Sequence, residues 1–166
     1  LKLTPNTQRQ LEQNLMLFYT GRTRAASGIL SRQKASSEQQ DPQVIESLHA
    51  VKAMTGDVQL ALESEDADAL GDILHESWER KKRFASNVSN ARLDELYALA
   101  RANGARGGKI AGAGGGGFMV FACPFDRRLE LERVLIDKGV IMRPFSFVTH
   151  GVQSWAVEEP ERERAP

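Results

Sequence analysis

Glycine is concentrated in one short segment of the chain. Seven of the 14 glycines lie between Gly107 and Gly117, in the run G-G-K-I-A-G-A-G-G-G-G. Each glycine in ordered structure costs about 0.5–1 kcal/mol of backbone entropy relative to alanine, so such a run needs a reason for bare backbone. Unobstructed N–H groups can line an anion site. We predict an ordered anion-binding loop made of Lys109, Gly112, Ala113, Gly114, Gly115, Gly116 and Gly117.

The context of this loop excludes the two common nucleotide motifs. Residues 112–117 satisfy G-x-G-x-x-G, but Phe118–Ala122 is β-like and Pro124 follows, whereas a dinucleotide loop opens a helix. A Walker A loop ends in Lys followed by Ser or Thr, and here Phe118 follows the last glycine. The alternative is a tight hairpin whose glycines only permit positive φ. One or two glycines would meet that need, so the count favours an anion.

The other candidate groups give weaker signals. His49, His75 and His150 show no mutual spacing typical of a metal site, and we predict no metal ligands. Cys123 has no evident base beside it and is expected in the core. The charged run 79–83 is expected to be a solvated helix end, from which Lys81 or Lys82 could reach a cleft. Lys109 either adds a cation to the loop or faces solvent at a strand end.

The elements that position this loop follow from apolar spacing and caps. Residues 15–19 form a short apolar run stopped by Gly21, typical of a buried strand. Thr4-Pro5 and Asp41-Pro42 are helix starts. Further helices are expected over 22–39, 65–84, 89–103 and 126–138, the last capped by Asp126, and further strands over 118–122, 140–142 and 145–148, with an edge or bend at Pro144.

This order predicts an α+β fold. Strands separated by helices, with a helical insert before the glycine loop, favour a ferredoxin-like small antiparallel sheet with the insert packed on one face. Trp78 and Trp155 are expected to be packing residues. Residues 158–166 are charged and poor in apolar side chains, so we expect a disordered tail.

Composition limits the partners. Lys plus Arg equals Asp plus Glu at 22 each, with a pI of about 7.0, which argues against nucleic acid and against an anionic membrane surface. No apolar run is long enough to span a membrane. One cysteine fits a reducing compartment, and we expect a cytoplasmic protein. A chain that opens on Leu1 is expected to be a piece of a longer protein.

Several segments resemble one family. The run Lys109–Phe118 resembles the third motif of the GHMP small-molecule kinases. Four further segments, at 17–24, 77–82, 88–97 and 150–155, resemble the D-glycero-D-manno-heptose 7-phosphate kinase branch of that family, and fucose kinases share a similar loop. The similarity covers about residues 1–155 and corresponds to the C-terminal domain, which we therefore place at residues 1–157.

This resemblance implies a function. It implies an ATP- and Mg2+-dependent kinase that transfers the γ-phosphoryl group to the anomeric hydroxyl of a heptose 7-phosphate, giving a heptose 1,7-bisphosphate. Arg22 and Arg24 could grip the phosphate of such a substrate bidentately, or simply face solvent. A fucose-type kinase and a non-catalytic ferredoxin-like module for ligand binding or interaction are the alternatives.

The resemblance also implies that this chain holds half of an active site. In the family a glycine- and serine-rich phosphate motif lies on an N-terminal nucleotide-binding domain, and no stretch here resembles it. The catalytic residues are expected on that domain, so none is nominated in this chain. The expected partners are ATP, a sugar phosphate and that N-terminal domain, and the oligomeric state is left open.

Overall fold

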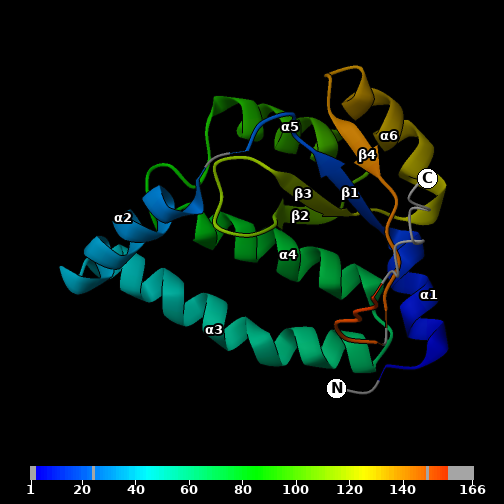
Figure 1. Ribbon diagram of the computed structural model, residues 1–166, viewed down its shortest axis with the longest axis horizontal. Coiled ribbons are helices and arrows are strands. Elements are labelled where there is room, and N and C mark those ends of the chain that lie inside the picture. Colours follow the sequence, from blue (N-terminus) through cyan, green and yellow to red (C-terminus); the bar gives the residue numbers. More distant parts are fainter. Residues whose placement is uncertain (1–2, 24, 149, 157–166) are drawn as a thin grey trace, which may run out of the picture.

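The structure is a computed structural model that describes residues 3–23, 25–148 and 150–156 (Figure 1). The helices are α1 (Pro5–Asn14), α2 (Ala26–Glu38), α3 (Pro42–Glu63), α4 (Ala67–Lys81), α5 (Ala91–Ala102) and α6 (Arg128–Ile136), with a short 3-10 turn η1 (Phe125–Arg127). The strands are β1 (Leu15–Tyr19), β2 (Gly107–Ile110), β3 (Phe118–Ala122) and β4 (Ile141–Arg143).

The four strands form one antiparallel sheet in the order β2-β3-β1-β4. Leu15 pairs with Ala122 and Tyr19 with Phe118, while Leu17 pairs with Arg143 on the other side of β1. The chain runs β1, helices, β2, β3, α6, β4, which is the split βαβ order of a ferredoxin-like fold. The predicted α+β class and the antiparallel sheet are therefore confirmed.

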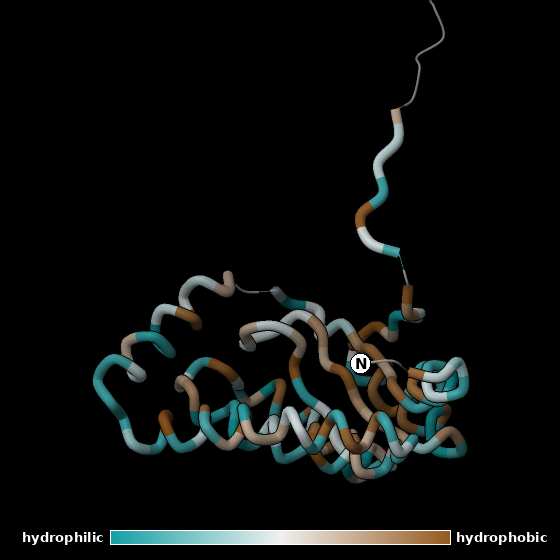
Figure 2. The backbone as a smooth tube through the Cα atoms, turned by 90° about the horizontal axis from the view of Figure 1, so that it is seen from below, coloured by the Kyte–Doolittle hydropathy of each residue, from teal (hydrophilic) through white to brown (hydrophobic). Residues whose placement is uncertain are grey.

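The main core lies against one face of this sheet. Alternate residues of β1, Met16 and Phe18, are almost completely buried and stand beside Phe121 and Met119 of β3 in the register. Helices α5 and α6 cover them with buried leucines: Leu93, Leu96, Leu131 and Leu135. Beyond this core, residues 150–156 run away from the body of the molecule (Figure 2).

Helices α2, α3 and α4 form the insert between β1 and α5. The carboxylate of Asp41 caps α3 by accepting the N–H groups of Gln43 and Val44, as the Asp41-Pro42 start predicts. Helix α4 makes the insert's contact with the sheet, along β2 and part of β3 (Figure 1). There the backbones touch, because a Cβ on Gly107 would lie 1.8 Å from the carbonyl oxygen of Gly71.

Two helices begin later than the sequence predicts: α2, the first helix of the insert, and α6. Helix α2 begins at Ala26 rather than Arg22, because the backbone carbonyl of Arg22 is held by the N–H of Gly117 at 2.6 Å. Asp126 does not cap α6, since it lies within η1 and α6 begins at Arg128 without a side-chain cap.

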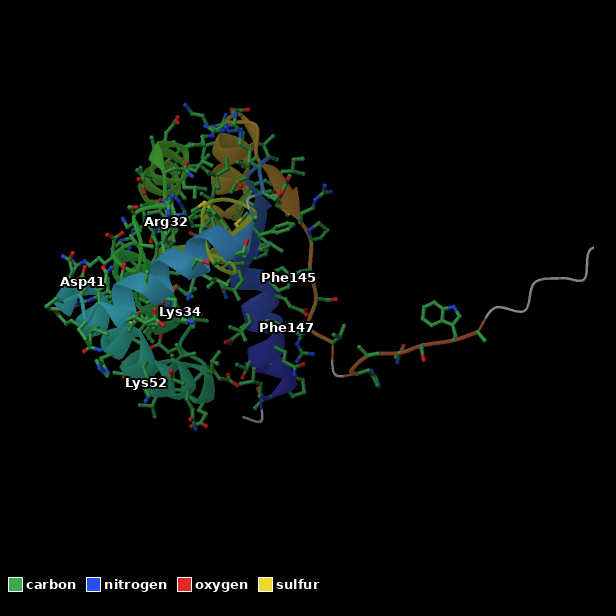
Figure 3. The ribbon with its side chains drawn as sticks, turned by 60° about the vertical axis from the view of Figure 1, so that its left-hand side comes forward. Arg32, Lys34, Asp41, Lys52, Phe145 and Phe147 are labelled. Atoms are coloured by element: carbon green, nitrogen blue, oxygen red, sulfur yellow. The ribbon has the colours of Figure 1, made fainter. Side chains whose placement is uncertain are left out.

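The C-terminal segment also departs from expectation. No strand forms over 145–148, because Pro144 removes an N–H and ends the edge strand β4 at Arg143. Instead the N–H of Phe147 donates to the carboxylate of Glu12, and Phe145 and Phe147 lie beside α1 (Figure 3). Trp155 is 80% exposed and is not a packing residue, whereas Trp78 is fully buried. The predicted tail at 158–166 lies outside the described residues.

Candidate functional site at the glycine loop

The glycine loop between β2 and β3 adopts a conformation that only glycine tolerates well. Residues Gly112, Gly114, Gly115, Gly116 and Gly117 all have positive φ, from 75° to 151°. A Cβ at Gly114 would lie 2.7 Å from the carbonyl oxygen of Val88, and one at Gly116 would lie 2.6 Å from that of Arg22. The loop's own geometry therefore accounts for its glycines, and their number alone does not indicate an anion.

The backbone donors of the loop give the stronger argument for an anion. The N–H groups of Gly115 and Gly117 donate to the carbonyls of Val88 and Arg22, at 2.8 and 2.6 Å. Within the part of the chain that the structure describes, no protein acceptor takes the N–H groups of Gly112, Ala113, Gly114 and Gly116. The loop thus keeps four donors available to a ligand or to water.

Three side chains from different parts of the chain hold the loop in place. The hydroxyl of Thr20, just after β1, donates to the carbonyl of Gly117 at 3.0 Å. The amide of Asn90, before α5, donates to the carbonyl of Gly115 at 3.4 Å. The ammonium of Lys81, the last residue of α4, donates to the carbonyl of Gly112. The loop is therefore fixed at both ends and at its middle.

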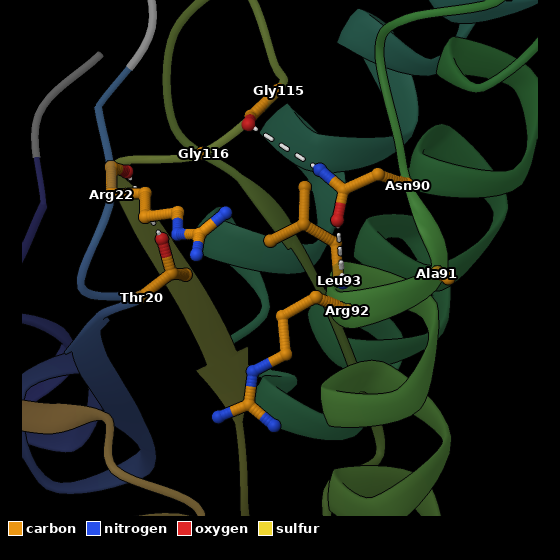
Figure 4. Close-up of a pocket in the computed structure, with 8 residues that line it drawn as sticks. All are labelled: Thr20, Arg22, Asn90, Ala91, Arg92, Leu93, Gly115 and Gly116. Atoms are coloured by element: carbon orange, nitrogen blue, oxygen red, sulfur yellow. Dashed lines mark hydrogen bonds between the residues drawn. The ribbon is translucent and has the colours of Figure 1, made fainter.

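A cavity of about 400 Å³ lies where the exit of the loop meets β1 and α5 (Figure 4). Its lining is Thr20, Arg22, Asn90, Ala91, Arg92, Leu93, Gly115 and Gly116. Sugar-sized ligands occupy cavities of this magnitude. The lining contains two arginines and no carboxylate, so the cavity favours an anionic ligand.

Arg22 is the cation most available to such a ligand. Figure 4 shows its side chain reaching from the end of β1 toward the start of α5. No carboxylate among the described residues forms an ion pair with it. Arg92 is partly committed, because it donates to Glu95 at 3.4 Å and to the carbonyl of Lys138. Arg24, the other arginine expected here, lies outside the described residues.

The N-terminus of α5 faces the same cavity. Asn90 caps the helix by accepting the N–H of Leu93 at 3.1 Å, which leaves the N–H groups of Ala91 and Arg92 at the cavity wall. The positive end of the helix dipole adds to the guanidinium charges. Ser89, the residue before this cap, donates to the carboxylate of Asp94 at 2.7 Å.

Lys109 lies away from this cavity, at the entrance of the loop. Its ammonium donates to the hydroxyl of Ser77 at 3.2 Å, and partial burial lowers its pKa. It is therefore half-buried against α4 and does not face solvent as a free strand-end lysine would. Of the predicted site residues, the cavity brings together Arg22, Gly115 and Gly116. The others that the structure describes lie outside its lining: Lys109, Gly112, Ala113, Gly114 and Gly117.

The structure adds residues that sequence reasoning missed. Arg92 and Thr20 line the cavity. Lys81, which the sequence offered together with Lys82 as able to reach a cleft, contacts the loop through the carbonyl of Gly112. Asn90 carried a usable signal, because asparagine before a helix is a preferred cap and caps point into helix N-terminal sites. Thr20 and Arg92 carried none, since a threonine before glycine and a helix-surface arginine are common in any sequence.

The remaining expectations about reactive groups concern Cys123, metal ligands and membrane spans. Cys123 is buried, and burial raises its pKa to about 11, which fits a core residue. Over residues 3–23, 25–148 and 150–156, no three His, Cys, Asp or Glu side chains gather as a metal site would require. In the same ranges, none of the helices has the length and apolar character needed to cross a membrane.

Comparison with known protein families identifies what this arrangement resembles. Residues 58–140 match the family described as GHMP kinases C terminal. The chain is 36% identical over 148 residues to D-glycero-alpha-D-manno-heptose 7-phosphate kinase of Campylobacter jejuni, covering 89% of this chain and 43% of that protein. It is 29% identical over 136 residues to the bifunctional fucokinase/GDP-fucose pyrophosphorylase of Arabidopsis thaliana, covering 81% of this chain and 13% of that protein.

Solved structures give the same picture. The crystal structure of a D-glycero-D-manno-heptose 1-phosphate kinase from Bacteroides thetaiotaomicron superposes with a TM-score of 0.65 and 27% identity. The match covers 96% of this chain and 40% of that one. The chain thus spans less than half the length of the relatives it matches.

Proposed function

Because this chain belongs to the GHMP kinase family as a C-terminal domain, we propose that it forms one wall of the active site of an ATP-dependent heptose 7-phosphate kinase. The enzyme would transfer the γ-phosphoryl group of ATP to the anomeric hydroxyl of the heptose, giving a heptose 1,7-bisphosphate. The 36% identity to the Campylobacter enzyme motivates the sugar, and the arginine-lined cavity beside the glycine loop supports a substrate that already carries a phosphate.

The environment of the Arg22 guanidinium is the observation that supports this proposal. A guanidinium without an ion-pair partner in the described chain, next to a helix N-terminus and the free N–H of Gly116, fits a phosphate monoester. The 7-phosphate would bind there, with Arg22 and the first N–H groups of α5 as donors. The cavity would then place the sugar along the glycine loop, toward the transferred phosphate.

The contribution of this domain to the reaction is positioning and charge compensation. Phosphoryl transfer spreads negative charge over the equatorial oxygens, and fixed N–H donors stabilise that charge without reorganising. The free N–H groups of Gly112, Ala113 and Gly114 are held for this role by the anchors at each end of the loop. Bound Mg2+ supplies further charge compensation in such kinases. Since the described residues gather no ligand set for it, no step is assigned to a metal held by this chain.

The fucokinase relatives define the second candidate substrate. The chain is 29% identical to the fucokinase of Arabidopsis thaliana, so an unphosphorylated sugar is the competing acceptor. The two candidates differ in one chemical group, the phosphate that Arg22 would bind. A preference for phosphorylated over unphosphorylated sugars therefore separates them.

The test is a substrate comparison with the complete gene product that carries this chain. We expect ATP-dependent product with D-glycero-D-manno-heptose 7-phosphate, and at least about a hundredfold lower kcat/KM with the same heptose lacking its phosphate, as a lost charged contact predicts. L-Fucose should react no better than the unphosphorylated heptose. Equal rates with phosphorylated and unphosphorylated sugars would contradict the proposal.

The 166-residue chain serves as the second arm of this test. Alone it should show no ATP turnover, because it carries no phosphate motif other than the glycine loop. Robust kinase activity from these residues by themselves would contradict the view that they form half of the site.

A further inference from the structure

Two lysines from different elements converge beneath the entrance of the glycine loop. Lys81 ends α4, and its ammonium donates to the carbonyl of Gly112. Lys109 lies in β2, and its ammonium donates to the hydroxyl of Ser77 on the same helix. The two charges are close enough that the charge of Lys109 acts on the titration of Lys81.

Neither lysine is neutralised by a carboxylate in the described part of the chain. The residues on either side of Lys81 are neutralised by carboxylates. Arg80 pairs with Glu76 at 2.7 Å, and Lys82 pairs with Glu79 at 2.7 Å. Lys81 and Lys109 have only neutral acceptors, and both are half-buried. Burial, and then the charge of Lys109, lower the pKa of Lys81 to about 8, and burial lowers the pKa of Lys109.

Two like charges in a partly desolvated place cost free energy. The helix C-terminus and the Gly112 carbonyl compensate part of the charge of Lys81. The charge of Lys109, however, is met by one hydroxyl alone. A bound anion would remove the remaining cost.

Lys81 reaches the start of the glycine loop through the Gly112 carbonyl, and backbone donors without a protein acceptor lie in the same part of the loop. Gly112 starts the loop, and its N–H, with those of Ala113 and Gly114, has no acceptor among the described residues. Ammonium groups and unpaired backbone N–H groups are both donors by which proteins bind phosphate. This set lies at the entrance of the loop, whereas Arg22 and Arg92 line the cavity at its exit.

We propose that Lys81 and Lys109 form a second anion site of the glycine loop, which binds a phosphate group of the nucleotide while the exit cavity binds the phosphate of the sugar. The assignment to the nucleotide rests on the proposed kinase function. The loop then separates the two phosphate-bearing substrates, with one cationic site at each end.

The experiment measures binding without turnover in the complete gene product, by isothermal titration calorimetry. ATP is titrated in the absence of sugar, and heptose 7-phosphate in the absence of ATP, against wild type, Lys81→Met, Lys109→Met and Lys81→Arg. Lys82→Met is the matched control, because Lys82 is the next residue and is neutralised by Glu79.

We expect Lys81→Met and Lys109→Met each to weaken ATP binding about tenfold, as the loss of one charged contact predicts, with heptose 7-phosphate and the Lys82→Met control nearly unchanged. At pH 8.5 the terminal phosphate of ATP is already fully ionised, so wild type should take up protons as the anion recharges Lys81. Lys81→Arg should retain ATP affinity and lose this proton uptake, since arginine stays charged.

Unchanged ATP affinity in both methionine variants, or loss of heptose 7-phosphate binding instead, would overturn the proposal. If Lys81→Met fails to fold, the Lys81→Arg arm decides: proton uptake equal to that of wild type contradicts it. A gene product that binds ATP through these lysines but phosphorylates no sugar refutes only the proposed kinase. A gene product that phosphorylates heptose 7-phosphate, but whose ATP affinity does not change when Lys81 or Lys109 is replaced, refutes only this site.

Discussion

The ammonium of Lys81 donates a hydrogen bond to the carbonyl of Gly112, which ties the C-terminal end of α4 to the start of the glycine loop. The last residue of α4 is therefore one of the anchors that hold the start of the loop in place.

The first prediction concerns the pH dependence of stability. Folding lowers the pKa of Lys81 from 10.5 to about 8. Between these pH values the unfolded chain holds a proton that the folded chain has released, so this group makes stability rise with pH. Its penalty is fully present below pH 8 and is gone above about 10.5.

Lys81→Met removes this penalty along with the bond to Gly112. The stability of the variant relative to wild type should therefore be highest below pH 8 and should fall as pH rises through the window. Urea unfolding of the chain at pH 7, 8.5 and 10 measures it, with Lys82→Met as the control. A difference from wild type that does not change with pH would refute the assignment.

The second prediction concerns the contact between α4 and β2. Gly107→Ala should destabilise the chain by more than about 3 kcal/mol, beyond ordinary overpacking, because the new Cβ would meet the backbone of Gly71 at 1.8 Å. Gly56→Ala is the control. Gly56 lies in α3 with open space around it, so alanine there should stabilise by about 0.5–1 kcal/mol. Thermal and urea unfolding measure both, and equal effects would mean that the backbones do not touch.

The third prediction separates two glycines of the loop. Gly112 and Gly116 both have positive φ, but only a Cβ at Gly116 would meet a backbone atom, the carbonyl oxygen of Arg22. Gly112→Ala should cost about 1–2 kcal/mol for the left-handed conformation alone. Gly116→Ala should cost more and should release Arg22. Denaturant unfolding of the two variants ranks them, and the reverse order would contradict this description of the loop.

The fourth prediction tests Arg22 as a specificity residue. In the complete gene product, Arg22→Gln should raise the KM for heptose 7-phosphate at least about tenfold, because the amide cannot replace a bidentate charged contact. The KM for ATP should change little. Arg9→Gln on the distant helix α1 is the matched control. A larger effect on ATP than on the sugar would place the nucleotide, not the sugar phosphate, beside Arg22.

Much of the fold could be predicted from local signals. Thr4-Pro5 and Asp41-Pro42 begin α1 and α3 as expected, and the apolar runs at 15–19 and 118–122 are strands. These elements follow from caps and periodicity, which act over a few residues. Prediction from the sequence failed where a residue distant along the chain determines the local conformation. Arg22 is held by Gly117 and not by its own helix, and Phe147 donates to Glu12 instead of extending β4.

The candidate site was only partly predictable for the same reason. The glycine run marks the loop, but nothing in the sequence places Asn90, Arg92 and Arg22 around one cavity. The number of glycines does not by itself indicate an anion, since positive φ and close backbone contacts explain Gly114 and Gly116 without a ligand. What supports an anion is the set of unpaired N–H groups, and only the three-dimensional structure shows which these are.

The position of β1 in the sheet has a consequence for folding. The strand nearest the start of the chain lies between β3 and β4, so Leu15 pairs with Ala122 and Leu17 with Arg143. On the ribosome, the apolar residues 15–19 therefore stay unpaired until the whole insert, the loop and β3 have been synthesised. Such long-range closure slows folding and leaves an aggregation-prone strand open in the meantime. Insert helices that fold early, by their own caps and contacts, shorten the effective distance that β1 must close.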